Sequence, residues 1–206
     1  MKITDELYNE VMLKYGFALN VLETNIKIML NEYEYKNKNN IVDHIKVRLK
    51  SKDSACKKLQ KKGYDTNIDN LVIHVHDLVG LRIVCPFLSD VYTVVNIIKN
   101  SKLFSIKDEK DYIANPKDTG YISYHLIVLV PIPIQDVIEY VEAEIQIRTM
   151  AMDFWASLDH KLQYKFIGEI PNDVKNEMQK CSMDIKIVDA KMQALKEFIT
   201  EHANEK

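Results

Sequence analysis

The chain has 206 residues, of which 47% are hydrophobic and 28% are charged, and its formal net charge is −2 at pH 7. This size and composition exclude a disordered chain and suit one well-buried domain better than two. A net charge so close to zero identifies no partner, so the distribution of charge along the chain carries the information.

Two long helices are expected at the ends of the chain. In residues 1–38, apolar side chains recur every three or four positions from Leu7 to Leu30, and no proline interrupts them. Pro171 suits the first turn of a second helix at 171–203, whose apolar stripe continues to Ile199. A stripe of this length requires a partner surface, which is either the core or another subunit.

Between these helices the apolar spacing changes to that of strands. Runs rich in Val and Ile predict strands at 81–87, 124–130 and 141–148, with a further one near 103–109. Helical spacing returns at 90–100, with Asp90 as the expected N-cap, and at 149–165. We therefore predict an α+β fold in which a mixed sheet of about five strands is flanked by helices.

Two further classes are excluded by cysteine use and hydropathy. The three cysteines, Cys56, Cys85 and Cys181, stand in no metal-type spacing, which fits small buried residues in a reducing compartment and not a disulfide framework. Residues 1–10 contain no apolar signal core, and the longest apolar run, residues 126–134, is about half the length of a membrane helix. We expect a cytoplasmic protein without a membrane segment.

Positive charge is concentrated in one segment. From Lys46 to Lys62 the sequence KVRLKSKDSACKKLQKK holds eight Lys or Arg residues and a single acid, Asp53. A solvated helix face is the plainer interpretation of this segment. The functional interpretation is an anion site, in which Arg and Lys bind phosphates or nucleic acid.

Three of the expected segments carry polar groups on one face because strand side chains alternate. These groups are Arg82 on the first, Tyr121, Ser123 and His125 on the second, and Glu144, Gln146 and Arg148 on the third. A single polar strand face would be an ordinary wet surface. Three together predict one lined cleft.

The chemistry of that cleft points to phosphoryl transfer. Asp77 and Glu144 are carboxylates suited to share one Mg²⁺, which proteins usually hold by one or two carboxylates together with phosphates. Tyr121 and the arginines offer flat surfaces on which nucleobases stack. Positioning and charge neutralisation do most of the catalysis in such transfers. The sequence has no GxxxxGK[ST] and no GxGxxG, so a nucleotide enzyme here is not a P-loop enzyme.

Four segments resemble the synthetase domain of the RelA/SpoT family, and more narrowly its small single-domain members, the small alarmone synthetases. In order within residues 40–168 they are HIKVRLKSKDSACKK, HDLVGLRIVC, KDYIANPKDTGYISYH and EIQIRTMAMDFWASLDHKLQYK. The resemblance implies a nucleotidyltransferase-like fold and one synthetase domain over 1–206. Its parts are an N-terminal helix (1–38), a catalytic core (40–168) and a C-terminal helix (171–203).

The activity that the resemblance implies is (p)ppGpp synthesis in the stringent response. A GTP diphosphokinase of this kind transfers the β,γ-diphosphate of ATP to the 3′-hydroxyl of GDP or GTP, or of GMP, and releases AMP. Asp77 and Glu144 are implied to be the catalytic pair and to bind Mg²⁺, with Glu144 also taking the proton of the 3′-hydroxyl.

The resemblance also implies which residues hold the two nucleotides. For ATP they are Arg48 and Arg82 at the adenine and Lys50, Ser54 and Lys58 at the phosphates. For the acceptor guanine nucleotide or the transferring phosphates they are Lys110, Lys117, Tyr121, His125, Gln146 and Asp153. Tyr121 would stack on guanine, whereas Asp153 either contacts the acceptor or only favours the start of its helix.

One position departs from the family pattern. Ile122 stands where the family usually has Arg or Gln, and alternation directs it away from the face of Tyr121. The cleft should therefore survive, while the acceptor preference and any regulation through this position stay open. Arg148 and His160 are expected to fix the corner between the last strand and its helix, and Trp155, Phe154 and Leu158 are expected in the core.

The residues also suggest two alternatives to the synthetase, a hydrolase and a catalytically silent regulator. His76–Asp77 matches a dipeptide of the hydrolase domain in long family members, but it directly precedes a strand, and the chain lacks the length of that extra domain. A catalytically silent nucleotide-sensing or RNA-binding regulator remains, because the basic segment suits single-stranded RNA. The terminal apolar stripes favour a homo-oligomer, a tetramer by analogy, and (p)ppGpp as an allosteric ligand stays open.

Overall fold

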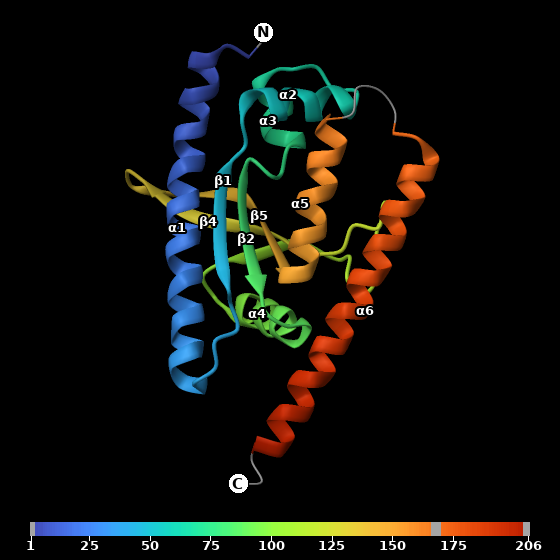
Figure 1. Cartoon of the computed structure of the whole chain (residues 1–206). Helices are drawn as coiled ribbons and strands as arrows, with labels where there is room; N and C mark the ends of the chain where they lie inside the picture. The colour runs from blue at the N-terminus through green and yellow to red at the C-terminus, as the bar shows by residue number, and fades with distance from the viewer. Residues whose placement is uncertain (1–2, 166–169, 204–206) are drawn as a thin grey trace.

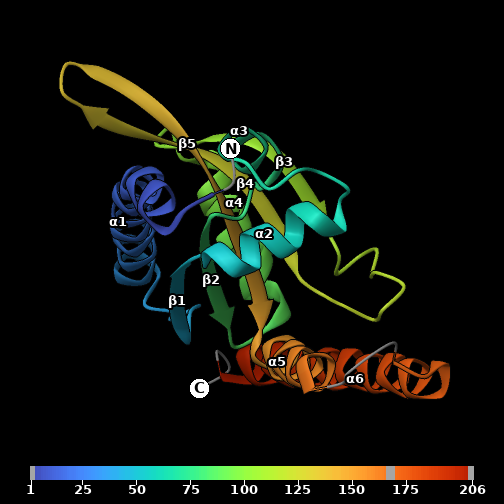
Figure 2. The same ribbon diagram turned by 90° about the horizontal axis from the view of Figure 1, so that it is seen from above.

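The computed structural model describes residues 3–165 and 170–203, which form a five-stranded mixed sheet with helices around it (Figures 1 and 2). The helices are α1 (Asp5–Asn37), α2 (Lys52–Lys61), α3 (Ile68–His74), α4 (Leu88–Asn100), α5 (Met150–Lys165) and α6 (Asn172–Ala203). The strands are β1 (His44–Leu49), β2 (Val79–Cys85), β3 (Ser105–Asp111), β4 (Tyr124–Ile134) and β5 (Val137–Thr149). The predicted α+β class and the two long terminal helices are confirmed.

The sheet has the order β1-β2-β5-β4-β3, and only the central pair β2 and β5 is parallel. A parallel pair needs a long crossover, and here α4, β3 and β4 lie between the two strands in sequence. The other three pairs are antiparallel, and of these only β4 and β5 are joined by a short turn, whereas α2 and α3 lie between β1 and β2 and a loop lies between β3 and β4. In this order β2 and β5 are interior strands, and like other buried strands they are rich in Val and Ile.

Helices α1 and α4 cover the apolar face of the sheet. α1 contacts β1, β2, β4 and β5, and α4 contacts β2, β5 and α1. Leu22 and Ile26 of α1 are fully buried, and they belong to the same core as Ile145 and Ile147 of β5. The predicted alternation of apolar and polar side chains along β5 is confirmed, since one face of this strand belongs to the apolar core and the other face is polar.

The basic segment 46–62 forms a strand and a helix, whereas the plainer of its two interpretations from the sequence was a single solvated helix face. Its first part is the edge strand β1, and its second part is α2, which is capped where Ser51 Oγ accepts the backbone N–H of Ser54 at 3.3 Å. Most β1 side chains are partly or fully exposed, so β1 has no clean apolar alternation. Neither β1 nor the short helix α3 was predicted.

The hairpin of β4 and β5 is longer than its apolar pattern predicted. Pro131 and Pro133 lie within β4, where a proline normally argues against a strand. Pairing with β3 ends at Leu129, so β4 has β5 as its only partner beyond that point. The prolines are tolerated because they need no hydrogen bond on the open side. Figure 2 shows this hairpin projecting past the rest of the sheet.

Three smaller expectations were wrong. Phe87 is the N-cap of α4, and Asp90 lies instead in the first turn, where it is buried and pairs with Lys196 Nζ at 2.6 Å. Phe154 and Leu158 are exposed (62% and 43%), so of the expected core residues of α5 only Trp155 is buried.

The cysteines also differ from the expectation in part. All three are free, but Cys85 alone is buried, while Cys181 is exposed and Cys56 is intermediate. Among the residues that the structure describes, no helix is long and apolar enough to cross a membrane.

The packing of α1 on the sheet gives a test of the fold. Leu22→Ala removes a fully buried side chain from the core, so we expect it to lower the free energy of unfolding by roughly 2–5 kcal/mol. Leu13→Ala on the same helix is the control, because Leu13 is 62% exposed. Urea unfolding followed by circular dichroism measures both; equal losses in the two variants would contradict this packing.

Candidate active site

Strand register gathers the polar side chains into rows across one face of the sheet. The residues paired across the first row are, one from each strand, Lys46, Arg82, Gln146, His125 and Lys110. In the next row Arg48 pairs with Gly80, and Gly80 with Glu144. The three expected polar segments therefore contribute to one surface, and β1 adds two further cations to it. Alternation had predicted that Tyr121 and Ser123 lie on a strand, but both precede β4, and Ser123 is fully buried.

Asp77 lies in the turn between α3 and β2 and is only 7% exposed. Lys50 Nζ is 2.6 Å from its Oδ2, Lys58 Nζ is 2.8 Å from its Oδ1, and Arg48 Nη2 is 3.9 Å from Oδ2. Burial raises the pKa of this carboxyl, but the hydrogen bonds and charges of the two lysines outweigh burial and hold the pKa at about 2. Asp77 is therefore an anion among three cations.

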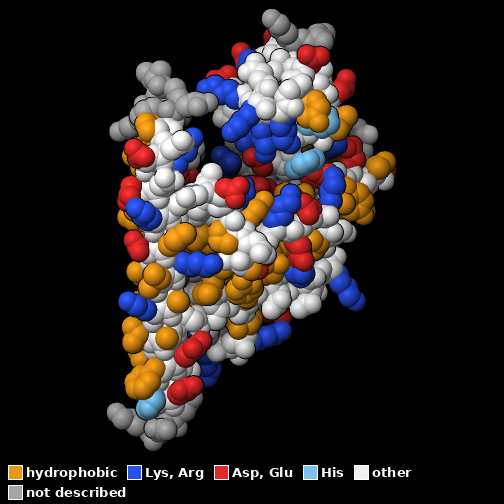
Figure 3. All heavy atoms as spheres, turned by 90° about the vertical axis from the view of Figure 1, so that its right-hand side faces the viewer, with side chains coloured by type: hydrophobic (Ala, Val, Ile, Leu, Met, Phe, Trp, Pro, Cys, Tyr) orange, Lys and Arg blue, Asp and Glu red, His pale blue; other side chains and the backbone are white. Residues whose placement is uncertain are grey.

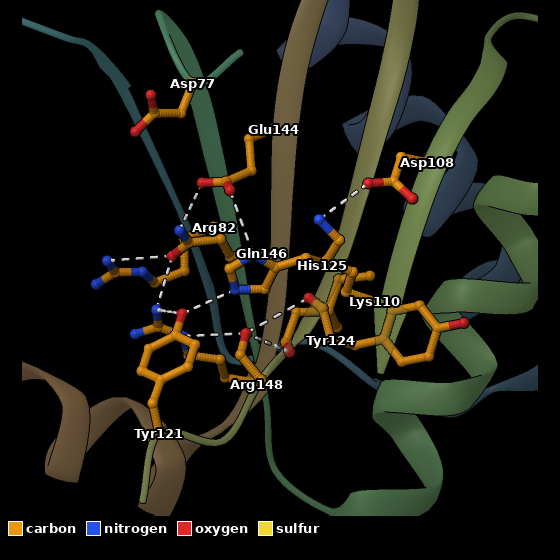
Figure 4. Close-up of polar contacts among 12 residues, drawn as sticks. Asp77, Arg82, Asp108, Lys110, Tyr121, Tyr124, His125, Glu144, Gln146 and Arg148 are labelled. Carbon is orange, nitrogen blue, oxygen red and sulfur yellow. Dashed lines mark hydrogen bonds and ion pairs between the residues drawn. The ribbon is translucent and has the colours of Figure 1, made fainter. Parts of the chain in front are cut away.

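Glu144 lies on β5, on the same face of the sheet as Asp77 (Figure 4). Gln146 Nε2 donates to its Oε2 at 2.7 Å, and His125 Nδ1 lies 3.2 Å from its Oε1. Burial raises the pKa of Glu144 and the charge of Asp77 also raises it, but the contacts with His125 and Gln146 prevail and lower it. Figure 4 shows the Asp77 and Glu144 side chains on the same side of the sheet, at neighbouring strands.

The donor set of this pair fits Mg²⁺. The two groups supply carboxylate oxygens, which Mg²⁺ prefers, and the surrounding cations would hold the phosphates that complete its coordination. Within residues 3–165 and 170–203 there is no group of three or more His, Cys, Asp or Glu that could hold a metal. The site thus suits a metal that arrives with a polyphosphate better than a metal held by protein ligands alone.

An arginine network fixes the end of the cleft nearest α5. Asp153 Oδ1 accepts from Arg82 at 3.0 Å and from Arg148 at 3.1 Å. Arg148 is 3% exposed and also donates to Gln146 Oε1 at 2.7 Å and to the hydroxyl of Tyr121 (Figure 4). The expected role of Arg148 at the strand–helix corner is confirmed. Asp153 binds both arginines, so its role is not limited to favouring the start of α5.

Three adjoining cavities lie along this surface. The largest, of about 600 Å³, is lined by residues that include Arg48, Lys50, Ser54, Arg82, Tyr121, Gln146 and His160. A second, of about 230 Å³, is lined by Arg48, Gly80, Arg82, Glu144 and Gln146, and a third, of about 120 Å³, by Lys110, Lys117, His125 and Glu144 among others. Glu144 therefore stands where the second and third cavities meet.

The cavities divide the residues assigned to the two nucleotides. Four of the five residues assigned to ATP line the largest cavity: Arg48, Lys50, Ser54 and Arg82. The fifth, Lys58, does not line it but forms an ion pair with Asp77. Of the residues assigned to the acceptor, Lys110, Lys117 and His125 line the smallest cavity, whereas Tyr121 faces the largest. Tyr121 still joins the two parts, because its hydroxyl lies 2.8 Å from His125 Nε2.

A loop between β3 and β4 carries Tyr121 and Lys117. Lys117 Nζ lies 4.5 Å from the ring centroid of Tyr112 and 5.0 Å from that of Tyr121. Burial lowers the pKa of Lys117; the charge of Glu144 opposes this, and those of Lys110 and Lys58 add to it. Ile122 is buried (4% exposed), away from this group, as alternation predicted.

Two further residues of the site were not predicted from the sequence, Gly80 and Tyr112. A Cβ on Gly80 would lie 3.3 Å from Arg48 Cγ, so this glycine gives the Arg48 side chain its place beside Glu144. Tyr112 packs edge-on against Tyr121 and His125, with ring centroids 6.1 Å and 5.2 Å apart. Tyr112 lies in a motif already noted, but Gly80 gave no signal before the register was known.

Fold and site together define a class of protein: a mixed sheet that presents two carboxylates among cations, suited to bind polyphosphates. A family described as the region found in RelA/SpoT proteins matches residues 47–169. The GTP pyrophosphokinase YwaC of Bacillus subtilis (strain 168) is 41% identical over 199 residues, which cover 97% of this chain and 95% of that protein. The chain therefore belongs to the RelA/SpoT family and, within it, to the small alarmone synthetases.

Solved structures agree along nearly the whole chain. The small alarmone synthetase 1 from Bacillus subtilis bound to its product pppGpp has a TM-score of 0.86 at 32% identity, covering 95% of this chain and 100% of that one. The same protein bound to AMPCPP has a TM-score of 0.79 at 31% identity, covering 96% of this chain and 100% of that one. The resemblance noted in the sequence is thus confirmed at the level of family and fold.

The Asp77 cluster predicts an acid-dependent stability. The pKa of Asp77 is lowered from 3.8 to about 2 in the folded protein, so its ion pairs stabilise the fold above the unfolded value and lose this effect as pH falls toward the folded value. We expect the stability difference between the wild type and Asp77→Asn to shrink by about 1 kcal/mol between about pH 5 and pH 3.

Urea unfolding at several pH values measures this difference, with Asp65→Asn as the control because Asp65 is exposed. A difference that does not change with pH would show that the lysine contacts do not hold the carboxyl in its charged form.

Proposed function

We propose that the chain is a GTP pyrophosphokinase that transfers the β,γ-diphosphate of ATP to the 3′-hydroxyl of a guanine nucleotide, giving AMP and (p)ppGpp. The observation that carries the proposal is the carboxylate pair Asp77 and Glu144 on one sheet face, flanked by cations from β1, α2 and β2. The names of the similar proteins support it, since they are a GTP pyrophosphokinase and a synthetase bound to pppGpp. With these substrates we expect a cytoplasmic enzyme of one synthetase domain.

ATP is proposed to occupy the largest cavity and its neighbour. Arg48 and Arg82 line both cavities, so a flat adenine there would stack between or upon guanidinium planes. Lys50, Ser54 and Lys58 lie at the start of α2 and around Asp77, where they would bind phosphate oxygens. The similar synthetase bound to AMPCPP, an ATP analogue, supports this half of the proposal.

The acceptor is proposed to lie between the loop of Tyr121 and strands β3 and β4. Tyr121 would stack on guanine, while Lys110, Lys117 and His125 would contact its phosphates or the transferring group. Gln146 and Asp153 would act mainly through Arg82 and Arg148, because their side chains already bind these arginines. GMP, GDP and GTP all fit this description.

Glu144 is proposed to receive the proton of the attacking 3′-hydroxyl. Its lowered pKa keeps it ionised at neutral pH, and it stands between the ATP cavity and the acceptor cavity. Asp77 and Glu144 would hold Mg²⁺, which would neutralise charge on the phosphates. His125 and Gln146 fix the orientation of the Glu144 carboxylate through their hydrogen bonds.

The activity is tested with purified protein, Mg²⁺, ATP and GDP, GTP or GMP, with products separated by chromatography. We expect release of AMP and of a 3′-diphosphorylated guanine nucleotide. Glu144→Gln keeps the shape but removes the proton acceptor, so the rate should fall by at least about 100-fold while ATP still binds. If no acceptor yields AMP with the wild type, the silent nucleotide-sensing or RNA-binding regulator replaces this proposal.

A homo-oligomer is proposed from the exposed apolar side chains of α6. Met183, Ile187, Leu195, Phe198 and Ile199 are each more than half exposed. Figure 3 shows hydrophobic side chains gathered along this helix toward the C-terminus. Single exposed apolar residues are ordinary, but a continuous stripe of them marks an interaction surface.

Light scattering at micromolar concentration tests the assembly. We expect a mass well above the 24.0 kDa of one chain, with four copies as the proposal by analogy. Ile187→Asp should shift the mass downward, because it places a charge in the stripe. A wild-type monomer would remove the proposal.

A further inference from the structure

The loop that carries Tyr121 is held from behind by the C-terminal helix. Gln179 Nε2 donates a hydrogen bond to the backbone carbonyl of Asp118, and Ser182 Oγ donates one to the carbonyl of Gly120. Both donors lie on α6, and they are 61 and 62 residues away in sequence from the carbonyls that they bind. Ser182 is 3% exposed, so its hydroxyl is committed to this contact.

Gly120 is shaped to allow this close approach. Its φ is +85°, a conformation that residues with a side chain rarely adopt. A Cβ at this position would lie 3.0 Å from Ser182 Cβ and 3.3 Å from Gln179 Cα. The glycine therefore lets the loop backbone rest directly on α6, and the next residue in the chain is Tyr121.

The loop is closed on itself at the same point. The N–H of Gly120 donates to the carbonyl of Lys117 at 2.8 Å, and the N–H of Lys117 donates to the carbonyl of Tyr121 at 3.2 Å. Any shift of the Gly120 carbonyl would therefore move Lys117 as well as Tyr121. At its other end, Tyr121 is fixed through its hydroxyl by His125 and Arg148.

We propose that Ser182 and Gln179 are positioning residues, through which α6 sets the place of Tyr121 and Lys117 at the acceptor nucleotide. The sheet holds the start of this loop, where Asp111 of β3 accepts the backbone N–H groups of residues 113–115. Further along the loop, the carbonyls of Asp118 and Gly120 instead accept hydrogen bonds from α6. An aromatic ring stacks well on a base only where the two rings lie in contact in a suitable relative orientation, so the position of the loop affects binding of the base. The inference deepens the proposed function and rests on it for the identity of the acceptor.

Steady-state kinetics of Ser182→Ala test the proposal in the full-length protein. Loss of one hydrogen bond to the loop should raise the KM for GDP roughly 3- to 10-fold, while the KM for ATP and the kcat stay at their wild-type values. A structural role for α6 in folding alone would lower kcat or the active fraction and leave the two KM values unchanged.

The matched control is Gln193→Ala on the same helix. Gln193 Oε1 accepts the backbone N–H of Ser89 at 3.1 Å, so this variant also removes one tether between α6 and the core. Its tether lies at α4, away from the loop, and the KM for GDP should not change. Equal effects of the two variants on that KM would overturn the proposal.

The hydrogen bonds from Gln179 and Ser182 to the loop, which we call the α6 clamp, can also be tested by amide hydrogen exchange, which needs no catalytic turnover. In Ser182→Ala, the amides of Lys117 and Gly120 should exchange faster than in the wild type, and in Gln193→Ala they should not. Unchanged exchange in Ser182→Ala would overturn the clamp even if the enzyme is active. If the wild type releases no AMP but the exchange result holds, the proposed function fails while the hold of α6 on the loop stands.

Discussion

The parallel pairing of β2 with β5 is the constraint on which the site depends. Its register sets Gly80 beside Glu144 and Arg82 beside Gln146, so that the turn holding Asp77, just ahead of β2, falls on the same side as Glu144. A slip of one residue would direct Glu144 and Gln146 into the core and Ile145 and Ile147 outward. Because those isoleucines are fully buried, the hydrophobic core selects the register that creates the site.

Burial and charge then act together on the two carboxylates. Each is buried enough that burial alone would raise its pKa, yet each is held in its charged form by neighbouring groups. Asp77 is held by two lysines, and Glu144 by His125 and Gln146. In the proposed function, a lysine that pairs with Asp77 before substrate binds would already be in place for a phosphate, which would reduce the cost of ordering that side chain.

The sequence predicted those features that follow from local periodicity. Alternation in β2 and β5 gave the polar face, and the three- and four-residue spacing gave α1, α5 and α6. The resemblance in the four motif segments gave the family. Asp77 and Glu144 could be predicted as a pair although 67 positions separate them in the chain, because both are carboxylates of the kind that polyphosphate sites need.

What the sequence could not predict depends on contacts between distant segments. β1 is an edge strand with exposed cations on it, so no apolar alternation reveals it. Pro131 and Pro133 are compatible with β4 only because β3 stops pairing at Leu129. Asp90 has the residue type of an N-cap, but Lys196, which lies 106 residues away, makes it one half of a buried ion pair.

The α6 clamp on the loop that carries Tyr121 could not be predicted either, because it also depends on contacts between distant segments. Gly120 and Ser182 carry no sequence signal that links them, and only the folded chain brings the helix against the glycine. The C-terminal helix thereby has two surfaces for which we propose different roles. Ser182 faces inward to the loop, while side chains such as Ile187 face outward with their apolar groups exposed.

The shared metal is the central claim, and anomalous diffraction tests it most directly. Crystals grown with AMPCPP and Mn²⁺ in place of Mg²⁺ would show where the ion binds. The account predicts one anomalous peak coordinated by an oxygen of Asp77 and an oxygen of Glu144. A peak coordinated by only one of these carboxylates, or located elsewhere on the protein, would contradict it.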